Sequence, residues 1–325
     1  MMKAAIRGAQ GLELAEVEAP TPGPEEVLVR VRACALNRAD LGVLAGQMHG
    51  KVGGAGTVLG MEWAGEVVET GAAATGFAPG DRVMCSGKAA FAQYAVADVG
   101  RTMKLPASSM SFERATTLPV ALQTMHDALV TNGRLKAGES VLIQGASSGV
   151  GLMALQIARL MGATTVIGTS TNAGRRARLA EFGADLALDS GDDGWVEQVL
   201  KATGGRGVDL IVDQLSGRVA NQNMMAAAVL GRIVNVGRLA GTRAEFDFDL
   251  HALRRIDYVG VTFRTRSVQE VREINRRMMA DLGPDLASGR LALPIDRVFP
   301  FEQIGDAFEH MRGNGHFGKI VVEMA

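Results

Sequence analysis

The sequence predicts a two-domain α/β protein, in which a mostly antiparallel β domain is joined to a domain with a doubly wound parallel sheet. The chain has 325 residues, and at roughly 150 residues per domain this length favours two domains. Short strand-like runs separated by glycine and proline fill the first part, and from about residue 118 strands alternate with helices. This change of pattern places the domain boundary near residue 118.

The first 118 residues carry the signals of the β domain. The segment 27–32 alternates apolar and polar side chains. Further short β runs follow at 66–69, 82–84 and 94–96. Frequent turn residues between these runs favour a compact antiparallel arrangement. A charged helix from about residue 267 precedes a last apolar strand at 319–323, which we expect to rejoin this domain. We therefore expect one domain over residues 1–118 and 267–325.

Residues 119–266 carry the signals of the parallel-sheet domain. A buried strand at 141–143 is followed by a helix over 152–158. The next strand, 165–168, is followed by a helix predicted over 175–182. Further strands are predicted at 187–188, 208–212, 232–236 and 258–263. Alternating strands and helices predict parallel strands joined by right-handed crossovers.

Composition and charge exclude several classes of protein. The 34 basic and 35 acidic side chains leave a net charge of -1, whereas nucleic-acid-binding proteins carry a basic excess. Cys34 and Cys85 are too few for a disulfide framework or a four-thiolate zinc site. The start has no apolar run of signal-peptide length, and glycines interrupt the uncharged stretch 140–158. We expect a soluble, cytoplasmic protein with neither a membrane nor a nucleic-acid partner.

The glycine-rich segment 145–151, GASSGVG, lies between a predicted strand and a predicted helix. Small residues there let the backbone approach a ligand, and the amides at the helix start favour an anion such as a pyrophosphate. The strict dinucleotide pattern is not met, because Ala146 and Ser148 replace its first two glycines and only Gly151 is kept. The βαβ context nevertheless favours nucleotide binding over a turn without a ligand.

Other functions are also compatible with this segment. Residues 145–149 also match G-x-S-x-G, the nucleophile elbow of serine hydrolases, with Asp213 and His251 as the remaining members of a triad. A non-catalytic NADPH-binding sensor is a third reading. A short-chain dehydrogenase is excluded, because no lysine stands four residues after either tyrosine, Tyr94 or Tyr258.

The end of the second parallel strand indicates which nicotinamide cofactor is used. An NAD site places a carboxylate there to bind the ribose hydroxyls. Residues 168–176 contain no carboxylate and offer Ser170, Arg175 and Arg176 instead. Hydroxyl and guanidinium groups suit a 2′-phosphate. We therefore predict NADPH rather than NADH.

With these features, the chain resembles the medium-chain dehydrogenase/reductase superfamily, in particular its zinc-independent quinone oxidoreductase branch. The resemblance rests on motifs spread over nearly the whole chain: residues 37–40 (NRAD), 60–65 (GMEWAG), 79–83 (PGDRV), 136–139 (KAGE) and 318–321 (GKIV). It implies a GroES-like β domain, a Rossmann domain, and NADPH-dependent reduction of a quinone or of a carbon–carbon double bond conjugated to a carbonyl. It also implies a homodimer formed through the last Rossmann strand, 258–263.

The resemblance also bears on zinc. Zinc-dependent relatives place a cysteine where Asn37 stands and a histidine where Met61 stands, while Glu62 is kept. Asparagine and methionine are poor zinc ligands, so we predict no metal. Without a Lewis acid, alcohol oxidation lacks a means of stabilising an alkoxide, whereas a conjugated acceptor delocalises the developing charge itself.

The resemblance finally implies the residues of the site. Asn37 and Thr124 would position the substrate and the nicotinamide. The cofactor would be bound by Thr124, Ser147, Ser148, Gly149, Val150, Thr169, Ser170, Arg175, Gly237, Arg238, Phe263 and Arg264. The substrate, a quinone, an enone or an enoyl thioester, is not determined by the sequence.

Overall fold

The computed structural model describes residues 1–50, 52–105 and 110–324. It divides into two compact units, one formed by Met1–Val120 with Phe263–Ala325 and the other by Ala121–Thr262. The sequence-based boundaries, 118/119 and 266/267, differ from these by a few residues. Each unit is described by itself.

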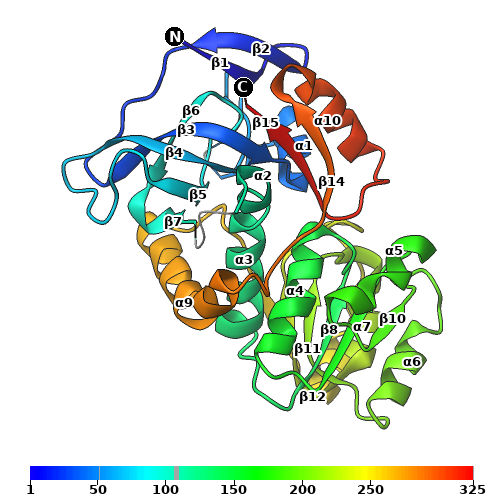
Figure 1. Ribbon diagram of the computed structural model, residues 1–325. Coiled ribbons are helices and arrows are strands. Elements are labelled where there is room, and N and C mark those ends of the chain that lie inside the picture. The colour runs from blue at the N-terminus through cyan, green and yellow to red at the C-terminus, as the bar shows by residue number, and fades with distance from the viewer. Residues whose placement is uncertain (51, 106–109, 325) are drawn as a thin grey trace. The chain divides into compact units, whose positions relative to one another are not determined.

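The first unit is built on a largely antiparallel seven-stranded sheet (Figure 1). Its strand order is β14-β15-β3-β4-β5-β7, and β6 also pairs with β3. These strands are β3 (Glu26–Ala35), β4 (Glu62–Thr70), β5 (Arg82–Ser86), β6 (Tyr94–Asp98), β7 (Thr102–Lys104), β14 (Ile295–Pro300) and β15 (Lys319–Glu323). A hairpin of β1 (Met2–Arg7) and β2 (Leu12–Val17) forms a separate small sheet. The last strand, β15, pairs antiparallel with β3 and brings Val321 opposite Ala35.

The core of the first unit follows from the alternation in β3. Val27, Val29 and Val31 are buried, whereas Arg30 between them is exposed. The rings of Phe91 and Phe308 meet edge to face with centroids 6.0 Å apart. Burial of such apolar side chains is the main stabilising contribution to the unit.

Helices and 3₁₀ turns complete the first unit. The long helix α9 begins with a capping box, in which Ser267 accepts a hydrogen bond from the Glu270 amide and the Glu270 carboxylate bonds back to Ser267. The elements are α1 (Arg38–Leu44), η1 (Val99–Arg101), α2 (Phe112–Ala115), α9 (Val268–Ala287), η5 (Phe301–Gln303) and α10 (Ile304–Arg312).

The second unit contains a six-stranded, fully parallel sheet in the order β10-β9-β8-β11-β12-β13. In order of appearance this is 3-2-1-4-5-6, the doubly wound arrangement that binds dinucleotides. The strands are β8 (Ser140–Gln144), β9 (Thr165–Thr169), β10 (Leu186–Leu188), β11 (Val208–Asp213), β12 (Ala227–Asn235) and β13 (Asp257–Gly260). The predicted fold class, a doubly wound parallel sheet with a mostly antiparallel GroES-like β domain, is thereby confirmed.

Helices connect the successive strands of the second unit. Figure 1 shows two of them, α4 and α6, beside the sheet. Helix α3 (Pro119–His126) precedes the sheet and continues into a π-helical segment, η2 (Asp127–Asn132). The others are α4 (Gly149–Leu160), α5 (Ala173–Ala177), η3 (Leu179–Phe182), α6 (Trp195–Ala202), η4 (Gly217–Val219), α7 (Ala220–Ala226) and α8 (Phe248–Arg254). None of the described helices is both long and apolar enough to cross a membrane.

Two predicted elements differ from the structure. The helix predicted over 175–182 is two shorter pieces, α5 and η3, which are separated at Arg178. The first piece begins earlier than predicted, because Asn172 caps it by accepting from the Arg175 amide. Gly183 ends the second piece with φ +103°, a left-handed conformation that glycine adopts without strain. The strand predicted over 258–263 ends at Gly260.

Candidate cofactor and substrate sites

The glycine turn between β8 and α4 needs glycine at two positions. Gly145 adopts φ +72°, in the left-handed region that glycine enters without strain. At Gly151 a Cβ atom would lie 2.7 Å from backbone atoms of Ala146 and Gly145. The third glycine of the pattern is therefore required for close packing of α4 against the turn, and the first two positions tolerate Ala146 and Ser148.

Ser148 organises the start of α4. Its hydroxyl oxygen accepts a hydrogen bond from the Gly151 amide at 3.1 Å, and it lies 3.0 Å from the Gln214 side-chain oxygen. Nearby, the Ser170 hydroxyl donates to the Ser147 hydroxyl at 2.9 Å. Gly149 and Val150 form the first turn of the helix, where backbone amides and the helix dipole favour an anion. The structure thus brings Ser147, Ser148 and Ser170 together at the helix start.

Beyond β9, the structure places the two arginines predicted near the cofactor on α5. Arg176 Nη1 donates to Asp189 Oδ2 at 2.9 Å and to the Ser170 carbonyl at 2.8 Å. Its charge is therefore offset by a carboxylate that the pattern at 168–176 did not reveal. Arg175 lies half-buried on α5, one residue earlier.

Below the turn lies a set of buried polar side chains, of which only Thr169 was predicted as a cofactor residue from the sequence. The Thr169 hydroxyl accepts from the Gly145 amide at 3.0 Å and donates to Gln144 Oε1 at 2.8 Å. Asn223 and Asp213 continue this set. Gln144 and Asp213 each end a strand directly after three consecutive apolar residues. A polar residue in that position was the available signal.

The remaining predicted cofactor residues lie in different parts of the chain. Gly237 follows β12, and a Cβ there would lie 2.5 Å from the Gln214 carbonyl oxygen. Arg238 Nη1 bonds to the Val236 carbonyl at 3.3 Å. Thr124 is half-buried on α3 in the second unit. Phe263 and Arg264 belong to the first unit, and Arg264 is exposed.

The first unit holds a second polar cluster around Asn37. The Asn37 amide group donates to Glu62 Oε1 at 2.8 Å, and the Lys319 ammonium donates to Asn37 Oδ1 at 3.0 Å. Lys319 also forms an ion pair with Glu62, and these two side chains are 5% and 0% exposed. The second oxygen of Glu62 accepts from the Val120 amide at 2.9 Å. Lys319 was not among the residues predicted for the site, although a lysine directly before the apolar residues 320–322 is unusual in a buried strand.

Asp40 lies beside this cluster. Its carboxylate accepts from the Asn37 amide at 2.7 Å and completes a capping box for α1. Burial raises the pKa of Asp40 to about 7; hydrogen bonds from the Asn37 and Gly60 amides and the charge of Lys319 lower it, and Glu62 raises it. The side chain is 1% exposed.

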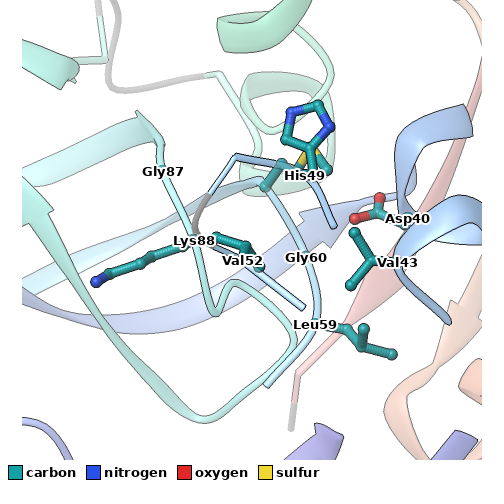
Figure 2. Close-up of a pocket in the computed structure, with 9 residues that line it drawn as sticks. Asp40, Val43, His49, Val52, Leu59, Gly60, Gly87 and Lys88 are labelled. Carbon is teal, nitrogen blue, oxygen red and sulfur yellow. The ribbon is translucent and has the colours of Figure 1, made fainter. Parts of the chain in front are cut away.

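A cavity in the first unit adjoins Asp40 and Met61. Figure 2 shows Asp40 on one side of the labelled group, and on the opposite side the Lys88 side chain, which extends away from the group. Partial burial and the charge of Arg264 lower the pKa of His49, which lies at the same cavity. The lining residues are Asp40, Val43, His49, Val52, Leu59, Gly60, Met61, Gly87 and Lys88.

The arrangement gives little support to a hydrolase triad. Ser147 is bonded to Ser170, and Asp213 accepts from the amides of Leu215 and Ser216 at 2.8 and 2.9 Å. His251 packs against the ring of Phe246, with centroids 5.4 Å apart. Each of these three groups is thus engaged elsewhere.

Models of two protein families match the chain. The model described as alcohol dehydrogenase GroES-like domain matches residues 23–107, and the one described as zinc-binding dehydrogenase matches residues 149–280. Among curated proteins, the synaptic vesicle membrane protein VAT-1 homolog of Rattus norvegicus is 30% identical over 93% of this chain and 78% of its own length. A highly reducing polyketide synthase of Emericella nidulans is 29% identical over 94% of this chain, which spans 12% of that protein.

Solved structures agree with these matches. The enoyl reductase of CurK is 26% identical with a TM-score of 0.87, and the alignment covers 99% of both chains. A quinone oxidoreductase of Pseudomonas syringae is 25% identical with a TM-score of 0.85, over 99% of this chain and 100% of the other. With the two family models and the relatives aligned over nearly its full length, this chain belongs to the medium-chain dehydrogenase/reductase superfamily of oxidoreductases.

Proposed function

We propose that this protein is an NADPH-dependent reductase that delivers hydride to a quinone, or to a carbon–carbon double bond conjugated to a carbonyl, without zinc. The observation that carries the proposal is the buried ion pair of Lys319 with Glu62. It places an ammonium group on the one carboxylate that remains of the zinc-ligand pattern.

The residues present do not fit a zinc ion, although one matching family model is named for it. Zinc is held in proteins by thiolate, imidazole and carboxylate ligands. Asn37 and Met61 offer an amide and a thioether, and Lys319 already neutralises Glu62. Over residues 1–50, 52–105 and 110–324, no group of three or more histidine, cysteine, aspartate or glutamate side chains is placed to hold a metal. We therefore assign no catalytic step to zinc.

The second unit fits a nicotinamide dinucleotide. The start of α4, with Ser147, Ser148, Gly149 and Val150, would hold the pyrophosphate. Ser170 and Arg175 would bind a 2′-phosphate beyond β9, where segment 168–176 has no carboxylate to repel it. Arg176 is less suited to that role, because Asp189 already pairs with it. Gly237, Arg238, Phe263 and Arg264 remain proposed neighbours of the nicotinamide.

The chemistry then depends on orientation. When bound, the cofactor supplies the hydride. The protein holds reactants in place, which contributes up to about 7–11 kcal/mol when the reacting atoms are well aligned. Asn37 and Thr124 are the proposed positioning groups. The hydrogen bonds from Lys319 and to Glu62 fix which way the Asn37 amide faces.

A homodimer is part of the proposal. β13 ends the sheet in the second unit, and an edge strand offers its backbone for pairing with another chain. Large apolar side chains are exposed on the neighbouring β12, α7 and α8, which contact one another. They are Met225, Val229, Leu230, Phe248 and Leu253. A second copy is the occupant we propose, and Leu253→Glu should then yield a monomer by light scattering.

A screen of NADPH oxidation with a quinone, an enone and an enoyl thioester tests the proposed activity. Turnover with at least one acceptor supports a reductase and identifies the substrate class. Cofactor binding without turnover would instead indicate a sensor. Covalent labelling of Ser147 by a fluorophosphonate would indicate a serine hydrolase.

A further inference from the structure

A chain of four buried side chains runs beneath the glycine turn, across the carboxyl ends of three neighbouring strands. Thr169 ends β9, Gln144 ends β8, Asp213 ends β11, and Asn223 lies on α7. All four are fully buried, with exposed fractions of 0%.

The hydrogen bonds along this chain all run in one direction. The Gly145 amide donates to the Thr169 hydroxyl, which donates to Gln144 Oε1. Gln144 Nε2 then donates to Asn223 Oδ1 at 2.8 Å, and Asn223 Nδ2 donates to Asp213 Oδ2 at 3.0 Å. Asp213 accepts at both oxygens, from Asn223 at one and from the Leu215 and Ser216 amides at the other. It therefore fixes the orientation of each side-chain amide and of the hydroxyl up to Gly145.

A second connection reaches the same turn from Gln214. Its Nε2 atom donates to the carbonyls of Gln144 and Gly145, at 3.1 and 3.3 Å, and its side-chain oxygen lies 3.0 Å from the Ser148 hydroxyl. The amide and the carbonyl of Gly145 and the capping hydroxyl of Ser148 are thus all hydrogen-bonded to side chains. Six side chains are involved in the two connections, and only Ser148 lies in the turn itself.

Such a network is costly to bury unless each member is satisfied. Apolar side chains would fill the same positions in the sheet with less desolvation. The network does one thing that apolar side chains do not: it sets the position of Gly145 through directional bonds. Gly145 opens the segment that ends in the amides of α4.

Resting on the proposed binding of NADPH, we propose that Thr169, Gln144, Asn223 and Asp213 are positioning residues that hold the pyrophosphate-binding turn in its binding-competent form. In this role Thr169 supports the turn from below and does not itself contact the nucleotide. The network should therefore affect cofactor affinity, with little effect on the rate of hydride transfer once the cofactor is bound.

The test compares Thr169→Val, which keeps the shape and removes the hydroxyl, with Thr169→Ser, which keeps the hydroxyl. Ser140→Ala serves as the matched control, because Ser140 at the opposite end of β8 makes a similar buried bond to Asp209 at 2.7 Å. The dissociation constant of NADPH is measured by calorimetry, kcat at saturating NADPH by steady-state kinetics, and the melting temperature by a thermal scan.

We expect Thr169→Val to weaken NADPH binding about fivefold, the equivalent of a net hydrogen bond of about 1 kcal/mol, with kcat within about twofold of the wild type. Thr169→Ser should bind NADPH like the wild type. Ser140→Ala should lower the melting temperature and leave the dissociation constant unchanged. Equal NADPH affinity in Thr169→Val and the wild type would overturn the proposal, as would an equal loss of affinity in Ser140→Ala.

A second variant and a hydrogen-exchange measurement complete the test. Gln144→Met replaces Thr169→Val if that variant does not fold, and the same loss of affinity is expected. Hydrogen exchange of the Gly145 amide without cofactor should be faster in either variant than in Ser140→Ala, and an unchanged rate would count against the network. If the wild type itself fails to bind NADPH, the proposed function fails, whereas the exchange experiment still tests the network.

Discussion

The glycine turn in the second unit and the Asn37 cluster in the first unit are assembled in different ways. The turn occupies seven consecutive residues, 145–151, between one strand and one helix. The cluster joins Asn37, Glu62 and Lys319, and Lys319 is 257 residues from Glu62 and 282 from Asn37. The turn is therefore visible as a motif, whereas the cluster exists only after the last strand of the chain pairs with β3.

The two regions also use polar groups differently. In the turn, side chains hold the backbone that leads to the start of α4, where we propose that the pyrophosphate binds. In the cluster, an ammonium and a carboxylate bind each other, so that Lys319 neutralises the charge of Glu62. Each of the following predictions tests one side of this comparison.

The largest effect is expected at the cluster. Lys319→Met leaves the Glu62 carboxylate buried without its cation, and removing one partner of a buried pair typically costs about 3–5 kcal/mol. The free energy of unfolding, measured by urea titration, should fall by about that amount. Arg32→Met is the control, since its pair with Glu66 in the same sheet is about one-third exposed and should contribute less than about 1 kcal/mol.

A double variant separates charge burial from packing. Glu62→Gln combined with Lys319→Met removes both charges and should recover part of the lost stability. A double variant no more stable than Lys319→Met would show that the ion pair is not the cause of the loss.

The next effect concerns the cofactor end of the second unit. Arg175→Ala should weaken NADPH binding by about 10- to 100-fold, because a charge-assisted bond contributes about 1.5–3 kcal/mol. NADH binding should change far less, since NADH lacks the 2′-phosphate. Calorimetry with both cofactors measures the difference, and equal losses would refute the assignment of Arg175 to the phosphate.

Burial of Asp40 beside the cluster should make the stability of the protein depend on pH. Because its pKa rises from 3.8 to about 7 on folding, the folded protein keeps a proton that the unfolded chain releases. The contribution of Asp40 to the free energy of unfolding is therefore fully present below about pH 4 and is lost as the pH rises to about 7. Between these values the free energy of unfolding falls by about 1.4 kcal/mol per pH unit. Asp40→Asn removes this titration.

Urea unfolding of the wild type and Asp40→Asn across that pH range measures the difference. The stability gap between the two proteins should change with pH below 7 and stay constant above it. A constant gap throughout would mean that Asp40 is ionised in the folded protein at all these pH values.

The smallest effects are expected at the two proposed positioning groups, one in each unit. Asn37→Ala and Thr124→Ala should each lower kcat/KM by about threefold to tenfold, the equivalent of one hydrogen bond. Asn37→Ala should also lower the melting temperature, because the buried Lys319 and Glu62 each lose a hydrogen-bond partner. Steady-state kinetics with the acceptor found in the screen provides the measurement. Wild-type kinetics in both variants would contradict the placement of the substrate.

Features formed by neighbouring residues could be predicted from the sequence, whereas contacts between distant segments could not. The doubly wound sheet, the β domain and the turn at 145–151 are specified by local periodicity and by turn residues. The pairing of Arg176 with Asp189, the ion pair of Lys319 and the network through Asn223 depend on contacts between distant segments. A single sequence does not give these contacts. The helix expected at 175–182 begins earlier because Asn172 caps it, and its division at Arg178 is not marked by a glycine or a proline at that residue.

The most direct test of the account is NADPH oxidation by protein that has been treated with a chelator and shown by elemental analysis to hold no zinc. With a quinone or conjugated acceptor, we predict that the rate equals that of untreated protein and exceeds the rate with NADH at least about tenfold. A rate that vanishes on chelation and returns only with added Zn²⁺ would contradict the account.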